Sequence, residues 1–365
     1  MKGPSRILFV LHRGARAGTE LHVLWLAQAL RRRGWEVALA LSRQGPITSS
    51  FEEAGVAVHL IRRRIGPDPR FVLELVRLAR TMRIDVLHAH SGRLGALAGR
   101  LARVPAVIET RHGLGQIGEP PPAWRLRKEA ASCRLAHRTL TVSQSDRDRL
   151  IAGGLSPERV VCIPNGIPPL AIERRTQEGG VVRLGFLGRL VPQKDPLFLA
   201  AIARALQARI PGAWHLLIAG EGPLRGRLAR TLERFGCAHA VEWLGEIDGP
   251  EALLSRVDLL CVPSRWEGQP LSILEAMAAG VVPLACSIAS LEELLGGDPP
   301  AGLLLPRDAE AWASAAIDLG HDAERRVAIV REARRRIDTK HRIDAMEAAI
   351  EQVYRDCFAS HSRSC

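Results

Sequence analysis

The chain has few aromatic residues, a scattered set of cysteines and no long apolar run. Phe, Trp and Tyr make up 4% of its 365 residues, which leaves little for stacking against nucleic-acid bases. The seven cysteines are odd in number and include no C-x-x-C pair, so neither a disulfide framework nor a structural zinc site is indicated. No window reaches the roughly 18 apolar residues of a membrane span, and no cleavage site follows the first apolar run. These absences predict a protein of the reducing cytoplasm that meets a membrane only peripherally, on its inner face.

Positive charge is unevenly distributed along the chain. The net formal charge is +12, yet residues 1–170 hold 27 Lys and Arg against 13 Asp and Glu, whereas the remainder holds 24 against 26. The excess therefore belongs to the first half. It indicates an anionic partner for that half, which leaves open a nucleic acid, an acidic membrane surface or a phosphorylated substrate.

The order of apolar segments predicts two α/β halves. Short β-branched or aliphatic runs alternate with longer segments of helical period, as in a parallel sheet with crossover helices. A stretch rich in Pro, Gly and Asn between them has the composition of a linker. We expect a first α/β domain over 1–165, a linker over 166–181, a second domain over 182–345, and a C-terminal helix and tail over 346–365 that packs back on the first.

Ligands of open α/β sheets bind beyond the carboxyl ends of the strands, so the loops after the strands of the second half are the candidate sites. One loop carries Gly188, Arg189 and Lys194, which combine close backbone approach with two cations suited to a pyrophosphate. Another carries Gly220 and Gly222 before a helix start, where unpaired N–H groups favour an anion. Either loop alone is equally consistent with glycines that only form a turn.

A third loop carries two carboxylates in E-x7-E spacing. Glu267 lies on the loop, whereas Glu275 lies about one turn inside the helix expected from Leu271. Two carboxylates facing one cleft suit the vicinal hydroxyls of a ribose, and the N–H groups after Gly268 suit an anion. The alternative is that Glu275 is a solvated helical residue, but its neighbours along the chain are apolar.

Taken together and in this order, these strings resemble retaining glycosyltransferases of family 4. The first half agrees through Ala17-Gly18-Thr19-Glu20, Asp85 to His90, Arg111-His112-Gly113 and Pro164-Asn165-Gly166. The resemblance covers about residues 5–355. It implies the GT-B fold, with two Rossmann-like α/β domains facing across a cleft, and an enzyme that uses a nucleotide-sugar such as a UDP- or GDP-sugar.

The resemblance also implies roles for individual residues. Catalytic roles fall to Glu267, His112, Arg189 and Lys194, with the two cations neutralising the donor diphosphate and His112 near the anomeric carbon. Acceptor binding falls to His90 and Glu20. The donor site would comprise Gly18, Gly188, Arg189, Lys194, Gly220, Gly222, Glu267, Gly268, Gln269, Pro270, Leu271 and Glu275, with Glu275 on the ribose. Where the family often has Gly after the lysine, this chain has Asp195.

The resemblance further implies that catalysis needs no metal and no other cofactor, because the cations stabilise the leaving diphosphate. Asp146 and Asp148 spell D-x-D, a metal-diphosphate signature of another glycosyltransferase fold. They open a helix, however, where Asp is favoured for helical reasons alone. His88 and His90 lie at the end of an expected strand. We expect His88 to be structural rather than a metal ligand.

The leading hypothesis is therefore a glycosyltransferase acting on a glycan or lipid-linked acceptor at an acidic membrane surface, in lipopolysaccharide, exopolysaccharide or glycolipid synthesis. A nucleic-acid-binding protein is the alternative that the net charge suggests. Against it, the first half has no recognisable nucleic-acid-binding motif, so we expect no nucleic-acid partner. A dehydrogenase is disfavoured because no strand is followed by an intact G-x-G-x-x-G.

Overall fold

The computed structural model divides the chain into two compact units, which we describe separately. Residues 5–64, 66, 68–90, 92–114, 122–170, 172 and 181–362 are described. The first unit holds Met1–Asn165 together with Ile343–Cys365, and the second holds Gly166–Arg342. Much of the expected linker, residues 171 and 173–180, lies outside the described residues.

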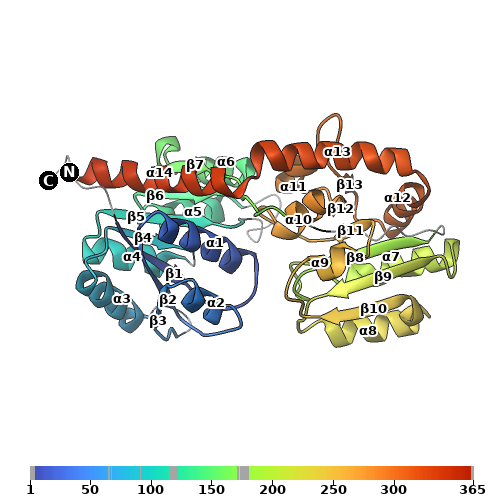
Figure 1. Ribbon diagram of the computed structural model, residues 1–365, viewed down its shortest axis with the longest axis horizontal. Coiled ribbons are helices and arrows are strands. Elements are labelled where there is room, and N and C mark those ends of the chain that lie inside the picture. Colours follow the sequence, from blue (N-terminus) through green and yellow to red (C-terminus); the bar gives the residue numbers. More distant parts are fainter. Residues whose placement is uncertain are drawn as a thin grey trace. The chain divides into compact units, whose positions relative to one another are not determined.

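The first unit is built on a seven-stranded sheet in the order β3-β2-β1-β4-β5-β6-β7, in which every neighbouring pair is parallel (Figure 1). Most residues of its strands are apolar, as expected of a parallel sheet covered on both faces. They are β1 (Arg6–Leu11), β2 (Glu36–Leu41), β3 (Ala57–Leu60), β4 (Val86–Ala89), β5 (Ala106–Arg111), β6 (Arg138–Thr141) and β7 (Val160–Cys162).

Helices cover both faces of this sheet and complete two buried cores. Side chains of α1 and α14 join one core and those of α3 and α4 join the other. The last helix, α14, thus returns to the first unit after the chain has formed the second, and Met346, Ile350 and Tyr354 are buried there. The helices of the first unit are α1 (Gly18–Arg32), α2 (Thr48–Glu53), α3 (Pro69–Thr81), α4 (Arg93–Ala102), α5 (Ala123–Cys133), α6 (Gln144–Ala152) and α14 (Ile343–Ser362).

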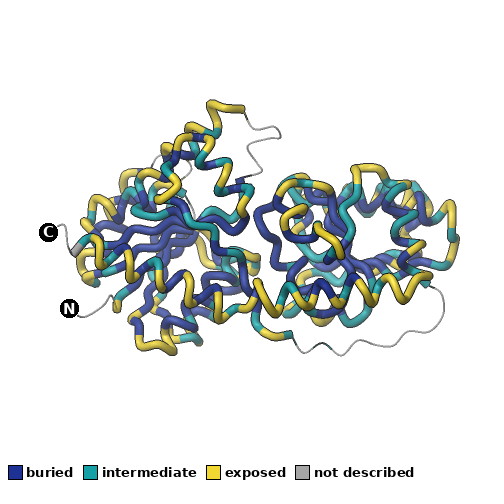
Figure 2. Tube along the Cα trace, turned by 90° about the horizontal axis from the view of Figure 1, so that it is seen from above, coloured by how far each residue is buried: buried dark blue, intermediate teal, exposed yellow. Residues whose placement is uncertain are grey.

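The second unit repeats this architecture with six parallel strands in the order β10-β9-β8-β11-β12-β13. In Figure 2 the strands of both units are mostly dark blue, whereas the outer faces of the helices are yellow. The strands are β8 (Val182–Leu187), β9 (Trp214–Ala219), β10 (Val241–Gly245), β11 (Leu259–Val262), β12 (Val282–Cys286) and β13 (Leu303–Leu305). The helices are α7 (Leu197–Arg209), α8 (Arg225–Arg234), α9 (Glu251–Leu254), α10 (Leu271–Ala279), α11 (Ala289–Leu295), α12 (Ala309–His321) and α13 (Ala323–Lys340).

Both sheets have a topological switch point, where successive strands are added on opposite sides of the first one. The switch lies between β1 and β4 in the first unit and between β8 and β11 in the second. Crevices at such points are the usual ligand sites of open α/β sheets. Among the described residues, no helix combines the length and apolarity needed to cross a membrane.

Two elements are not apparent from the sequence pattern alone. The sequence does not single out β7, because three residues are too few to establish a pattern. The basic C-terminal stretch consists of three helices, α12, α13 and α14. The break before α13 falls at Asp322, whose side chain accepts a hydrogen bond from the N–H of Arg325 and so caps that helix.

Candidate active site

The candidate donor site lies at the switch point of the second sheet. The loop after β8 and the loop after β11 leave adjacent strands there, because β8 pairs directly with β11. Lys194 on the first loop and Glu267 on the second form an ion pair, with 2.6 Å between Nζ and Oε1. The two side chains are only 16% and 6% exposed, so the pair is held in a largely desolvated position.

Three side chains that the sequence did not single out hold the second loop in place through its backbone carbonyls. Gln193 Nε2 donates to Trp266 O at 3.2 Å. Ser290 Oγ donates to Glu267 O at 2.9 Å, and Arg307 donates to Pro263 O at 3.1 Å. The carboxylate of Glu267 is thus positioned by its own backbone as well as by Lys194.

Asp195 shows how this chain departs from the family pattern. Its φ is +44°, a left-handed conformation that a glycine adopts without steric penalty and that Asp tolerates better than most residues. Its carboxylate is ion-paired with Arg307 and, at 3.3 Å, with Arg265. The aspartate therefore connects the end of the first loop to cations that follow β11 and β13.

The glycines of these loops are required by the packing of one loop on another. A Cβ on Gly220 would lie 2.1 Å from the carbonyl oxygen of Gly188, and one on Gly222 would lie 2.5 Å from that of Leu190. Gly220 also has a φ of +129°. The structure thus gives Gly220 and Gly222 a packing role, which leaves a phosphate-binding role for them as a prediction.

Glu275 lies within α10, as expected, and is 9% exposed. Burial raises the pKa of its carboxyl to about 7, and the nearby charge of Glu251 adds to this effect. Neither an ion pair nor a hydrogen bond to this carboxyl is found within the described residues, so it is available to a polar ligand.

The start of α10 has no side-chain cap, because Pro270 occupies the N-cap position. The first N–H groups of the helix, beginning at Leu271, therefore lack a side-chain acceptor from that position, which favours an anion nearby. Gly268 and Gln269 precede them and are also buried. Arg189, by contrast, is exposed and makes no ion pair within the described part of the chain.

In the first unit, the expected site residues gather at the switch point between β1 and β4. Gly18 and Glu20 form the first turn of α1 after β1, and His90 directly follows β4. His112 follows β5, and its Nε2 lies 2.9 Å from Nδ1 of His90. The structure thus brings His90 and His112 together.

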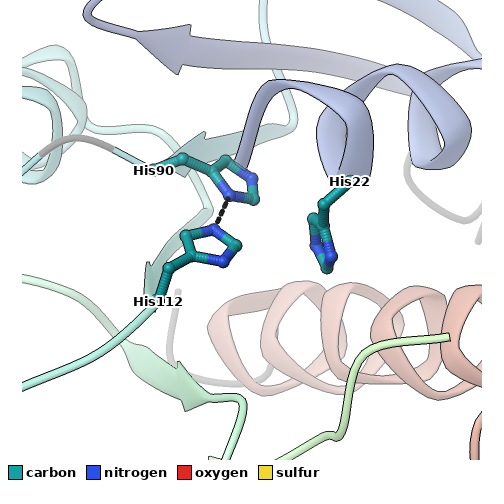
Figure 3. A group of neighbouring side chains, drawn as sticks. All are labelled: His22, His90 and His112. Atoms are coloured by element: carbon teal, nitrogen blue, oxygen red, sulfur yellow. Dashed lines mark hydrogen bonds between the residues drawn. The ribbon is translucent and has the colours of Figure 1, made fainter. Parts of the chain in front are cut away.

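His22 on α1 joins these two residues, and the sequence analysis missed it. It is 2% exposed and its ring lies 5.1 Å from that of His112 (Figure 3). Burial lowers the pKa of His22 to about 4 and lowers the pKa values of His90 and His112 well below the ordinary value. The three imidazoles are therefore neutral near pH 7. No spacing rule links residues 22, 90 and 112, so only the fold shows the cluster.

Two residues considered as alternative ligands have structural roles. Both nitrogens of His88 are hydrogen-bonded, Nδ1 to Tyr354 Oη at 2.6 Å and Nε2 to Thr110 Oγ1 at 2.7 Å. The carboxylate of Asp146 accepts hydrogen bonds from the N–H of Leu114 at 3.2 Å. Asp146 therefore holds the loop that carries His112. This structural role is enough to explain an aspartate at the first position of the D-x-D string.

Models of two protein families match the two halves of the chain. "Glycosyltransferase Family 4" matches residues 16–169, and "Glycosyl transferases group 1" matches residues 182–322. Among curated proteins, the chain is 27% identical to the UDP-Gal:alpha-D-GlcNAc-diphosphoundecaprenol alpha-1,3-galactosyltransferase of Escherichia coli, over 72% of this chain and 74% of that protein. It is 26% identical to the 2-deoxystreptamine N-acetyl-D-glucosaminyltransferase of Streptomyces fradiae, over 92% and 90%.

A solved structure extends the likeness to the fold. HepE of Anabaena, crystallised with UDP and glucose, superposes with a TM-score of 0.82 at 20% identity, over 95% of this chain and 98% of that one. This likeness confirms the expected GT-B fold with two Rossmann-like units.

Proposed function

The chain belongs to the glycosyltransferases of group 1 and family 4, a retaining family that uses nucleotide sugars, and we propose that it transfers a hexosyl group from a UDP-sugar to an anionic lipid-linked or cell-envelope glycan. The observation that carries the proposal is the Lys194–Glu267 ion pair at the switch point of the second sheet. UDP is favoured over GDP because the E. coli relative is named for UDP-Gal and HepE was crystallised with UDP-glucose.

Charge in the second unit matches a nucleoside diphosphate. The Lys194 ammonium has three N–H donors, of which Glu267 takes one, so two remain for phosphate oxygens. The uncapped start of α10 and the exposed Arg189 supply further donors. Glu275 follows on the same helix and is assigned to the ribose hydroxyls.

The chemistry follows from where charge develops. As the bond from the anomeric carbon to the β-phosphate oxygen breaks, negative charge grows on that phosphate, where Lys194 and Arg189 stabilise it. The acceptor oxygen bonds to the anomeric carbon on the same face, and its proton passes to the leaving phosphate. This scheme retains configuration and needs no protein nucleophile. The roles of Gly18 at the donor phosphate, His112 at the donor sugar, and Glu20 and His90 at the acceptor remain predictions from the family resemblance.

The acceptor is proposed from the charge of the first unit. That unit holds 29 Lys and Arg against 17 Asp and Glu, a net charge of +12, whereas the second unit holds 22 of each. The diphosphoundecaprenol acceptor in the name of the E. coli relative is anionic and lipid-linked. The 2-deoxystreptamine of the Streptomyces relative is a cationic diamine at neutral pH, which a basic unit would repel.

The proposal predicts that the Lys194–Glu267 pair has a function beyond stability. Lys194→Met leaves a buried carboxylate unpaired and should lower the free energy of unfolding by about 1–3 kcal/mol. Adding Glu267→Gln to this variant removes the unpaired negative charge and should restore the free energy of unfolding. Turnover of UDP-sugars, measured as UDP release, should stay about a hundredfold to a thousandfold below the wild type in both variants.

Lys340→Met, which removes an exposed cation at the end of α13, is the matched control and should match the wild type in both assays. The donor is identified beforehand by a thermal-shift screen over nucleotide sugars, because a ligand stabilises the fold that binds it. A stable double variant that turns over donor at the rate of the wild type would refute the proposal.

A further inference from the structure

Three histidines of the first unit converge on one point although they come from α1 and from the loops after β4 and β5. Figure 3 shows the side chains of His22, His90 and His112 close together, with His90 and His112 joined by a hydrogen bond. Their ring centroids lie 5.1 to 5.5 Å apart in every pair. One nitrogen from each ring lies within 4.8 Å of the corresponding nitrogens of the other two.

Two nitrogens of this cluster are left without a partner. Nε2 of His22 and Nε2 of His90 are both buried and make no hydrogen bond. An unsatisfied buried polar atom costs about 1–3 kcal/mol, so two in one cluster call for an explanation. A ligand that accepts lone pairs from both nitrogens would provide one.

Asn165 fixes which nitrogen of His22 can bind such a ligand. Nδ1 of His22 lies 3.1 Å from Asn165 Oδ1, and a carbonyl oxygen only accepts. Nδ1 therefore carries the proton, and the lone pair is on Nε2, the nitrogen without a partner. An outer-shell acceptor on the far nitrogen is the arrangement that orients metal-binding histidines.

The chemistry of the cluster selects a transition metal over other ligands. The cluster presents imidazole nitrogens and no carboxylate oxygen of the kind that Mg²⁺ or Ca²⁺ prefers. Neutral imidazole nitrogens are typical ligands of Zn²⁺, and three histidines with an open fourth position form a familiar zinc site. His88 is excluded as a ligand because both of its nitrogens are already hydrogen-bonded.

We propose that His22, His90 and His112 form a binding site for a transition-metal cation of the Zn²⁺ class. In tetrahedral coordination with Zn–N bonds of about 2.0–2.1 Å, ligand nitrogens lie about 3.4 Å apart. One nitrogen of each ring already lies within 4.8 Å of those of the other two, so small side-chain rotations close the site. His112 is less buried than the other two histidines, which leaves a route by which the ion enters.

Metal binding would inhibit the enzyme. When His112 binds a metal ion, its metal-binding nitrogen is no longer available for the donor sugar. Micromolar Zn²⁺ should therefore suppress sugar transfer reversibly. This consequence rests on the proposed function of His112, whereas metal binding itself does not.

The test is a titration of the full-length, metal-free protein with Co²⁺, whose visible absorption reports tetrahedral coordination, followed by displacement with Zn²⁺. We expect one ion per chain. His22→Ala and His112→Asn should each weaken binding by more than the about 10- to 100-fold typical of changing an outer-shell partner. His239→Ala, which removes an exposed histidine of the second unit, is the matched control and should bind as the wild type does.

Circular dichroism establishes that each variant is folded. His112→Asn, at the less buried position, is included in case the change at buried His22 prevents folding. The inference would be overturned if the wild type showed no tetrahedral Co²⁺ binding. It would also be overturned if folded His22→Ala and His112→Asn bound Co²⁺ as tightly as the wild type. Metal binding together with an absence of any UDP-sugar turnover would instead uphold the site and refute the proposed function.

Discussion

The buried carboxyl of Glu275 links protonation to the stability of the protein. Glu275 lacks a cation among the described residues, and burial raises the pKa of its carboxyl to about 7. The folded protein therefore binds more protons at this site than the unfolded chain does, over the range from about pH 4.5 to about pH 7. Ribose hydroxyls that donate to the carboxylate would favour its charged form and lower this pKa.

This pKa predicts a particular dependence of stability on pH. The wild type should lose up to about 3 kcal/mol of stability as pH rises through that range, because the folded state must give up a proton into a poorly solvated site. Glu275→Gln abolishes this loss, so the variant should gain stability over the wild type from about pH 5 to about pH 8. Thermal unfolding of both proteins at the two pH values measures the difference.

Saturating UDP should shrink that difference, because binding favours the charged carboxylate. Calorimetry in buffers of different ionisation enthalpy should detect the accompanying release of a proton. A gap between wild type and variant that is constant across this pH range would contradict the assignment of a raised pKa.

Residues whose chemistry depends on local spacing could be predicted from sequence, whereas residues that act through the fold could not. The spacing of Glu267 and Glu275 placed one on a loop and the other inside a helix, as the structure shows. Ser290 and Arg307 act on backbone carbonyls 23 and 44 residues away, so no local pattern distinguishes them. His22 lies among the apolar residues of α1, where a buried histidine is not distinguished from core.

At the scale of elements, α14 illustrates how a helix is fixed to a distant part of its own fold. Tyr354 donates or accepts a hydrogen bond at 2.6 Å with buried His88 on β4. Glu351, one turn earlier, accepts from Trp35 Nε1 at 3.1 Å and pairs with Arg33 at 2.7 Å. The helix is thus held by buried polar contacts as well as by apolar packing.

Removing one hydroxyl tests this attachment. Tyr354→Phe leaves Nδ1 of His88 buried without a partner and should lower the free energy of unfolding of the first unit by about 1–3 kcal/mol. Gln352→Ala, on the exposed face of the same helix, should change it by less than about 0.5 kcal/mol. Urea unfolding with and without UDP separates the two units, because the proposed donor residues Lys194, Glu267 and Glu275 are in the second.

If Tyr354→Phe proves as stable as Gln352→Ala, the hydrogen bond to His88 does not contribute to holding the helix.

Sequence periodicity located the longer strands and helices of both sheets, because repeated burial leaves a pattern. The expectation that the C-terminal helix packs back on the first domain did not come from this periodicity, because the pattern of one helix does not specify the surface that buries it.

At the scale of the whole molecule, the excess of positive charge in the first unit bears on the predicted contact with an acidic membrane surface. Trp124 on α5 is 61% exposed. Arg125, Arg127 and Lys128 on the same helix are exposed around it. An aromatic ring beside several cations is typical of a helix that binds an acidic lipid surface.

Vesicle sedimentation tests this expectation. The wild type should bind vesicles that contain acidic lipid, and binding should fall as salt screens the charges. Trp124→Ala should weaken binding severalfold, because an interfacial tryptophan contributes apolar contact. Leu101→Ala is the control: it removes an apolar side chain that is 50% exposed on α4 of the same unit, and it should not weaken binding to the vesicles. Equal binding to neutral vesicles, or binding insensitive to salt, would contradict the membrane proposal.

The return of the chain to the first unit makes the second unit an insertion within the first. The chain leaves the first unit after Asn165 and re-enters it at Ile343. Ile167 N donates to His341 O at 3.0 Å, and Ile167 pairs with Arg342 in a parallel bridge. The entry and exit segments are therefore adjacent, and the second unit could be excised and the gap closed by a short joint. Simple truncation after Asn165, by contrast, would strip α14 from the first core and leave its apolar face uncovered.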